Sequence, residues 1–243
     1  MSNALEVEAL CKSFGPVRAV DSCSFAVKPN AITALIGPNG SGKTTVFNLV
    51  TGYVRPDSGR VRFAGRDVTG KDPGRMYRRG LSRTFQQARV FPQLTVRENV
   101  VVARGYSWPE LFARRSTSAD QQRAVELLEE FGMMHVADLF ASELSYGQRK
   151  LLEFASVLVS EPSLVLLDEP TAGVNPVMIE TMERHIRQRH AAGITFLIVE
   201  HDMQFVMRLC DPVVVMDRGR PIFAGSPDQV QTNPLVLDAY LGA

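Results

Sequence analysis

The segment from Gly37 to Thr45 carries the clearest chemical pattern in the sequence. It matches G-x-x-x-x-G-K-[ST], in which glycines let the backbone turn and aim its amides at phosphate oxygens. Lys43 is expected to reach the β- and γ-phosphates, and the Thr44 hydroxyl is expected to bind Mg²⁺. We therefore predict a nucleotide-phosphate site made of Gly37, Pro38, Asn39, Gly40, Ser41, Gly42, Lys43, Thr44 and Thr45.

Two acidic residues end an apolar run further along the chain. Leu164 to Leu167 has the length of a buried strand, and Asp168 and Glu169 follow it directly. Because unpaired charge is costly to bury, carboxylates at the end of such a strand indicate a functional edge. Asp168 is expected to hold Mg²⁺ through its hydration shell, and Glu169 to act as general base toward an attacking water. Taken alone, the pattern also fits an ordinary strand edge.

A third motif and one histidine complete the chemical set. A serine and a glycine at the start of a helical pattern offer a second anion site, since first-turn amides are free. Taken alone, this motif also fits a serine N-cap. His201 follows a buried strand, where an imidazole can hydrogen-bond a transferred phosphoryl group. His135, His185 and His190 are expected at the surface. The motif consists of Leu144, Ser145, Tyr146, Gly147 and Gln148.

The elements that position these residues alternate between strand and helix. Buried strands are predicted at 31–36, 164–167, 194–199 and 213–216, and helices from residue 44 to 52 and from 176 to 191. Turn residues between 53 and 69 predict a small antiparallel excursion. Residues 90–157 read mostly as helix, and N-cap signals at Ser226 and Asn233 predict two short final helices. This alternation of strands and helices is typical of an α/β fold with a helical insertion.

Composition excludes several classes of protein. The 243 residues include 27 Lys and Arg and 26 Asp and Glu, for a net charge of +1, which argues against a dedicated nucleic-acid binder. No apolar run approaches the roughly 18 residues that span a bilayer, and the N-terminus lacks the features of a signal peptide. The sequence predicts a cytosolic protein. Cys11, Cys23 and Cys210 are expected to be reduced thiols.

Together these motifs resemble those of the ATP-binding cassette (ABC) ATPases. Gly37–Thr45 resembles the Walker A loop, Leu164–Asp168 the Walker B strand, and Leu144–Gln148 the LSGGQ signature, with Tyr146 in place of a glycine. Gln86, in Arg83-Thr-Phe-Gln86, is similar to the Q-loop glutamine that senses the metal and the γ-phosphate. His201 is similar to the switch histidine. The resemblance extends from about Leu5 to the C-terminus.

This resemblance implies a fold and a set of roles. The fold is α/β, a P-loop NTPase with a RecA-like core, an antiparallel β subdomain and a helical insertion. A single ABC ATPase domain would span residues 1–243, with 1–87 and 158–243 as the core and 88–157 as the helical subdomain carrying the signature. Glu169, His201 and Gln86 would be catalytic, with Thr44, Gln86 and Asp168 around Mg²⁺. The implied ligands are ATP and Mg²⁺.

Two further residues are assigned by the same resemblance. Phe14 is similar to the aromatic residue that stacks on adenine, with a core Phe as the alternative. Asn175 stands where most of these ATPases have the Asp of the D-loop. An amide keeps the capacity to hydrogen-bond but loses the charge. The usual acidic contact between two ATPase subunits is therefore in doubt, although a hydrogen bond is still available.

Within the family, Arg83–Asn99 and Asn233–Gly242 resemble the LivG-like ATPases of branched-chain amino-acid importers. Importers for urea, amides or aromatic acids share much of this pattern, and a non-transport ABC ATPase is a more distant alternative. The resemblance implies a head-to-tail dimer with a homologous, different ATPase chain, in which each ATP lies between one phosphate loop and the partner's signature. It also implies two permease subunits, indirect action of an extracytoplasmic solute-binding protein, and a peripheral position on the cytoplasmic face of the membrane.

One segment departs strongly from the neutral net charge. Residues 55–89 hold ten basic and three acidic residues. The simplest interpretation is a solvated face, and the alternative is contact with acidic lipid or with a permease. Trp108 and Phe112, in the insertion, are interpreted either as partner contacts or as core.

Overall fold

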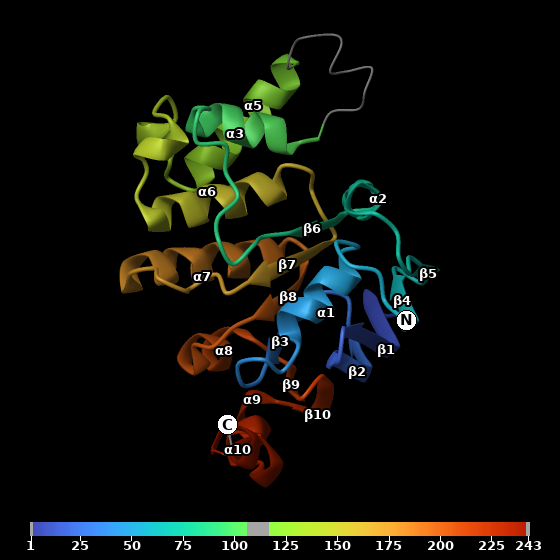
Figure 1. The fold of residues 1–243 in the computed structure, drawn as a ribbon. Helices are drawn as coiled ribbons and strands as arrows, with labels where there is room; N and C mark the ends of the chain where they lie inside the picture. The colour runs from blue at the N-terminus through green and yellow to red at the C-terminus, as the bar shows by residue number, and fades with distance from the viewer. Residues whose placement is uncertain (1, 106–116, 242–243) are drawn as a thin grey trace. The chain divides into compact units, whose positions relative to one another are not determined.

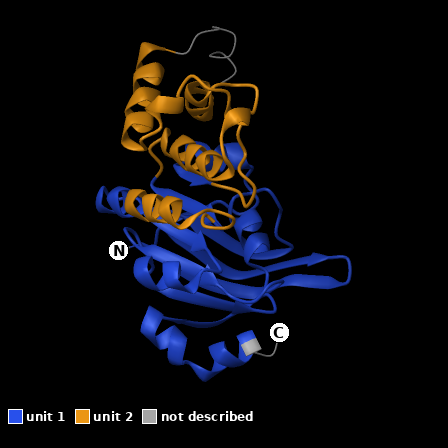
Figure 2. Ribbon diagram, turned by 90° about the vertical axis from the view of Figure 1, so that its left-hand side faces the viewer, with its two compact units in different colours: residues 1–83, 163–169, 186–243 blue, residues 84–162, 170–185 orange. Residues whose placement is uncertain are grey.

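The structure is a computed structural model that describes residues 2–105 and 117–241 (Figure 1). Trp108, Phe112 and Gly242 lie outside the described residues. The chain separates into two compact units (Figure 2). Unit 1 consists of residues 1–83, 163–169 and 186–243, and unit 2 consists of residues 84–162 and 170–185. Unit 2 thus extends on both sides of the range 88–157, and it includes the first part of a helix that ends in unit 1.

Unit 1 contains two β-sheets. The first is antiparallel, with strand order β2-β1-β4-β5, and the second has the order β10-β9-β3-β8-β7-β6. In the second sheet β9, β3, β8, β7 and β6 are parallel neighbours, and β10 pairs with β9 in the antiparallel direction. The strands are β1 (Leu5–Phe14), β2 (Val17–Val27), β3 (Ile32–Ile36), β4 (Ser58–Phe63), β5 (Arg66–Asp67), β6 (Leu81–Arg83), β7 (Leu164–Asp168), β8 (Thr195–Val199), β9 (Val213–Asp217) and β10 (Arg220–Gly225).

Five helices lie wholly within the described part of unit 1, and one of them joins its two sheets. Helix α1 contributes Val46, Phe47, Leu49 and Val50 to a hydrophobic core shared with residues of both sheets. Burial of these apolar side chains stabilises the connection from β3 through the phosphate loop into α1. The helices are α1 (Lys43–Val50), α2 (Pro73–Arg78), α8 (Met203–Leu209), α9 (Pro227–Thr232) and α10 (Pro234–Leu241). The short last two begin at prolines, as the N-cap signals predict.

Unit 2 is helical in its described part. Its elements are α3 (Val96–Ala103), α5 (Ser118–Glu130), η1 (Met134–Val136), η2 (Ala141–Glu143), α6 (Tyr146–Leu158) and the first part of α7 (Pro176–Ala191). Hydroxyl residues begin several of these helices by accepting a backbone hydrogen bond, and Thr95, Thr117 and Ser145 each form a capping box. These caps fix where α3, α5 and α6 begin.

The strands and helices expected from the sequence are confirmed with small shifts at their ends. Two strands, β6 and β10, were not expected, and the three residues of β6 between turns give no periodic signal. The expected surface position of His185 is wrong. Its ring is buried and stacks on Phe131, with the ring centroids 4.0 Å apart. An imidazole is flat and partly apolar, so it packs here as an aromatic residue.

Candidate functional site

The phosphate loop connects the carboxyl end of β3 to the start of α1. At two positions of this loop the backbone geometry requires glycine. Gly37 has φ of +148°, and an added Cβ would lie 2.1 Å from the Met216 carbonyl oxygen. Gly42 has φ of +101°, and a Cβ there would lie 2.4 Å from the Ala19 carbonyl oxygen. Gly42 caps α1 without a side-chain hydrogen bond, so the first-turn amides stay available to an anion.

Lys43 is buried in the curve of this loop. Its ammonium donates to the carbonyl oxygens of Gly37 at 2.8 Å and Pro38 at 2.9 Å, and to the Ser41 hydroxyl at 3.3 Å. Burial lowers the pKa of Lys43, while the negative charges of Glu169 and Asp168 oppose this shift. The loop therefore holds its cation on its own carbonyl groups and close to both acids.

Asp168, at the end of β7, forms a buried ion pair with Arg83, at the end of the neighbouring strand β6. The guanidinium Nη2 lies 2.7 Å from the carboxylate Oδ2, and the two side chains are 5% and 2% exposed. The other terminal nitrogen of Arg83 donates to the side-chain oxygens of Asn48 and Thr51 in the segment of α1. This pair fixes the Asp168 carboxylate, since a buried charge needs a charged, hydrogen-bonded partner.

Glu169 follows directly and lies against His201. Its Oε1 is 2.8 Å from the His201 Nε2, and its backbone N–H donates to the Val199 carbonyl. Glu169 has φ of +48°, an uncommon left-handed conformation for a residue with a side chain. Strained backbone of this kind is found where a functional group must be aimed. The carboxylate and the imidazole are therefore held in direct contact at this edge of the sheet.

Glu200 fixes the backbone that carries His201. It is buried, and its Oε2 accepts hydrogen bonds from the N–H groups of His201 at 2.7 Å and Asp202 at 3.1 Å. The Asp202 side chain in turn caps α8 by accepting from the Phe205 N–H. The turn between β8 and α8 is thus held by carboxylates, which sets the position of the imidazole opposite Glu169.

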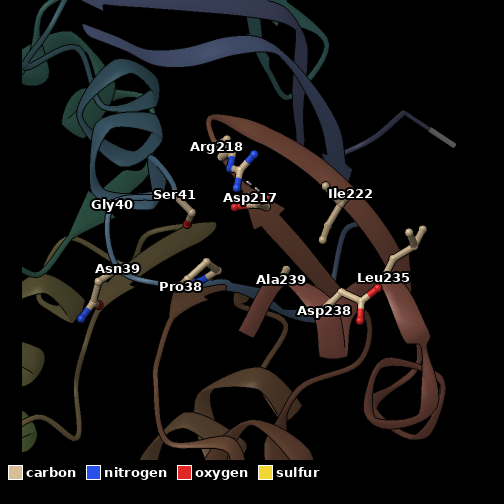
Figure 3. A pocket seen from close by; sticks show the side chains of 10 residues that line it. All are labelled: Pro38, Asn39, Gly40, Ser41, Asp217, Arg218, Ile222, Leu235, Asp238 and Ala239. Carbon is tan, nitrogen blue, oxygen red and sulfur yellow. Dashed lines mark ion pairs between the residues drawn. The ribbon is translucent and has the colours of Figure 1, made fainter. Parts of the chain in front are cut away.

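A cavity of about 570 Å³ borders the outer side of the phosphate loop (Figure 3). Pro38 to Ser41 line one side of it, and Ile222 of β10 and Leu235 of α10 line another. Asp217 and Asp238 add two carboxylates, and Asp217 lies 3.8 Å from the Arg218 guanidinium. Lys43, Glu169 and His201 are not among the lining residues, so this cavity is a neighbour of the loop rather than the place where the reactive groups meet.

Gln86 and the signature segment belong to unit 2. Gln86 is exposed, and its carbonyl oxygen accepts from the Tyr146 hydroxyl at 3.5 Å. The Ser145 hydroxyl accepts from the Gln148 N–H, so it caps α6, as the simpler sequence interpretation expects. Leu144 is buried, while Ser145 and Tyr146 are exposed and Gly147 packs on Met178. The structure thus brings Gln86 and Tyr146 together within this unit.

Comparison with known proteins agrees with these observations. The sequence profile of the family described as ABC transporter matches residues 20–172, more than half of the chain. The chain belongs to the ABC transporter family. A second profile, described as branched-chain amino acid ATP-binding cassette transporter, matches residues 220–243. The expected P-loop NTPase fold is therefore confirmed by family as well as by strand order.

The similarity to known ABC proteins extends over nearly the whole of this chain. The high-affinity branched-chain amino acid transport ATP-binding protein LivG of Escherichia coli is 38% identical over 98% of this chain and 97% of its own. The protein of the same description named BraF, from Pseudomonas aeruginosa, is 37% identical with the same coverage. A crystal structure of a nucleotide-free ATP-binding cassette from an ABC transporter matches with a TM-score of 0.90 and 35% identity, covering 100% of both chains.

The remaining ABC motif residues have clear positions. Phe14, at the end of β1, is 50% exposed, and the Lys12 ammonium lies 5.6 Å from its ring centroid. The alternative of a core Phe is therefore wrong. Asn175 is exposed, and its side-chain oxygen accepts from the Met178 N–H at 2.9 Å, which caps α7. Asn175 thus acts as a helix cap within its own chain.

The residues expected around Mg²⁺ offer suitable donors. Thr44 supplies a hydroxyl, Asp168 a carboxylate and Gln86 an amide oxygen, and such hard oxygen donors are the ones Mg²⁺ takes. Thr44 is exposed in the first turn of α1, and Asp168 ends β7 at the same carboxyl edge of the sheet. Few protein oxygens are needed, because Mg²⁺ keeps waters and binds substrate phosphates. The donor set therefore fits this ion.

The sequence did not identify Arg83 and Glu200 as parts of the site. Arg83 was counted with the basic segment 55–89, yet it is buried against Asp168 rather than solvated. A single sequence does not reveal that β6 and β7 are neighbours. The ion pair between Arg83 and Asp168 could therefore not be predicted. The sequence did contain a signal for Glu200, because this acid follows an apolar strand as Glu169 does.

Proposed function

We propose that this chain is the ATP-binding and hydrolysing subunit of an importer for branched-chain amino acids. The observation that carries the proposal is the carboxyl edge of the parallel sheet, where Glu169 and His201 lie 2.8 Å apart. At the same edge the negative charges of Glu169 and Asp168 raise the pKa of Lys43 against the effect of burial. The names of LivG and BraF, together with the match at residues 220–243, support the class of solute.

The proposed reaction is in-line attack of water on the γ-phosphorus of ATP. The loop amides and Lys43 bind the β- and γ-phosphates and stabilise the charge that develops on them. Glu169 orients the water and accepts its proton, while His201 holds the Glu169 carboxylate and hydrogen-bonds the transferred group. The bond between the γ-phosphorus and the bridging oxygen breaks, and ADP leaves with the electron pair. Thr44, Asp168 and Gln86 would hold Mg²⁺, which when bound would neutralise phosphate charge.

The proposed assembly joins this chain to other subunits. Ser145 and Gly147 would contact the ATP bound by a second, homologous ABC ATPase, and Phe14 would stack on adenine in its own chain. ATP then stabilises the dimer, and loss of the γ-phosphate loosens it. Two permease subunits would receive this movement through the Gln86 segment at the cytoplasmic face of the membrane, and a solute-binding protein would act indirectly. No helix of the described residues is long and apolar enough to cross a membrane.

The exposed Arg78 and Arg79 are proposed to belong to the partner-facing side of segment 55–89. Reversing both to Glu replaces two positive charges by two negative ones, so acidic lipid or acidic permease loops would be repelled. We expect weaker copurification of the membrane complex. Copurification at the level of the unaltered chain would contradict a role for these residues and would leave a solvated face.

The general-base assignment is tested by Glu169→Gln. We expect ATP binding to persist and hydrolysis to fall by about a hundredfold or more, because the amide cannot accept the proton. Glu126→Gln makes the same chemical change on the exposed face of α5 and is expected to leave turnover unchanged. Lys43→Ala is expected to abolish binding itself. Hydrolysis at the unaltered rate in Glu169→Gln would refute the assignment.

The solute is tested on the complex. After copurification of the permease subunits and the solute-binding protein, the binding protein is screened for ligand-induced thermal stabilisation. Stabilisation by leucine, isoleucine or valine supports the proposal. Stabilisation only by urea, amides or aromatic acids would replace the proposed solute while leaving the ATPase role intact. Absence of vesicle-dependent ATPase activity would instead favour a non-transport ABC ATPase.

A further inference from the structure

A buried acid in α6 contacts the segment that contains Gln86. Glu153 is 4% exposed, and its Oε1 accepts hydrogen bonds from the backbone N–H groups of Phe85 and Arg89, each at 3.1 Å. The two amides lie on either side of Gln86, so one carboxylate oxygen joins both ends of this short turn. All of these residues belong to unit 2.

Two further side chains of α6 reach the same backbone. The Lys150 ammonium donates to the Phe85 carbonyl at 3.4 Å, and the Tyr146 hydroxyl donates to the Gln86 carbonyl at 3.5 Å. Tyr146, Lys150 and Glu153 are spaced by four and three residues, which places them on one face of the helix. That face begins at the signature motif, and it binds the backbone of residues 85–89 through both donors and acceptors.

Packing alone does not explain why a carboxylate is buried at this position. Burial raises the pKa of Glu153 to about 7, and the N–H groups of Arg89 and Phe85 and the charge of Lys150 offset only part of that effect. The second oxygen, Oε2, has no hydrogen-bond partner in the part of the chain that the structure describes. An apolar side chain would avoid this cost but would accept no hydrogen bond from the segment.

We propose that Glu153 is a positioning residue that fixes the Gln86 segment on α6, so that this segment and the signature motif move as one body. The inference rests on the proposed function, in which the signature grips ATP bound by the partner and the Gln86 segment contacts the permease. A movement of the signature is then transmitted through the rigid helix and its hydrogen bonds to residues 85–89.

The test compares Glu153→Leu, which removes the acceptor at similar size, with Glu153→Gln, which retains one acceptor oxygen. Hydrogen exchange resolved at single amides is measured on the intact chain. We expect exchange at Phe85 and Arg89 to rise by about tenfold or more in Glu153→Leu, and to stay near the unaltered rate in Glu153→Gln. The kcat for ATP is expected to fall several-fold in Glu153→Leu, with little change in KM.

Leu152→Ala is the matched control, because Leu152 is the buried neighbour in α6 and makes none of these hydrogen bonds. It should lower the melting temperature without selectively raising exchange at Phe85 and Arg89. Unchanged exchange at both amides in Glu153→Leu, or an equal rise along all of α6 in both variants, would overturn the inference. Should the unaltered chain hydrolyse no ATP, the proposed function would fail while the exchange data would still judge the role of Glu153.

Discussion

The stability of this protein should depend on pH through Glu153, and Glu153→Gln should remove that dependence. Burial raises the pKa of the carboxyl from its ordinary value of 4.5 to about 7. The folded chain therefore binds this proton more tightly than the unfolded chain does. The stability that the protonated group contributes is fully present below pH 4.5 and is lost as the pH rises through 7.

The size of the effect follows from these two values. Between pH 5 and pH 8 the Glu153 carboxyl is mostly deprotonated in the unfolded chain, whereas in the folded chain it keeps its proton until the pH approaches 7. Integrating the difference in bound protons gives a loss of about 2–3 kcal/mol in the free energy of unfolding over this range. The side chain is 4% exposed, so solvent screening removes little of this amount.

Urea denaturation followed by circular dichroism at several pH values measures the effect. The quantity of interest is the free energy of unfolding of Glu153→Gln minus that of the unaltered chain. It should grow by about 2–3 kcal/mol from pH 5 to pH 8, whatever constant the buried amide adds. Glu129→Gln, at an exposed position in α5, serves as the control and should show no such trend. A difference that stays constant with pH in Glu153→Gln would refute the reasoning.

Two further predictions concern unit 1. Arg83→Leu leaves the buried Asp168 carboxylate without its ion pair and should cost about 3–5 kcal/mol in urea denaturation. Adding Asp168→Asn should recover part of that loss, and strict additivity would contradict the pairing. Gly37→Ala should lower the melting temperature and abolish nucleotide binding, since its Cβ would meet the Met216 carbonyl at 2.1 Å. Gly40→Ala has open space and should be milder in both assays, so equal losses would argue against this clash.

The sequence predicted those parts of the fold and site in which neighbours along the chain act together. Lys43 lies among the carbonyl groups of its own loop, and Asp168 ends its own strand. Contacts between distant segments could not be predicted. The ion pair of Arg83 with Asp168 depends on the order of β6 and β7, and the burial of His185 depends on Phe131, which directly follows α5. Glu153 gave no signal either, because one acid on a helix is normally solvated.

The division of the chain into two units gives the residues of the site a second significance. The chain passes between the units after Arg83, after Pro162, after Glu169 and after His185. Arg83, paired with Asp168, and Glu169, paired with His201, are each the last residue of unit 1 before such a passage. Any change in the orientation of the helical unit would therefore act on the peptide bonds that follow Arg83 and Glu169. Two of the four crossings thus begin directly at residues of the candidate site, so no intervening stretch of chain separates those residues from the helical unit.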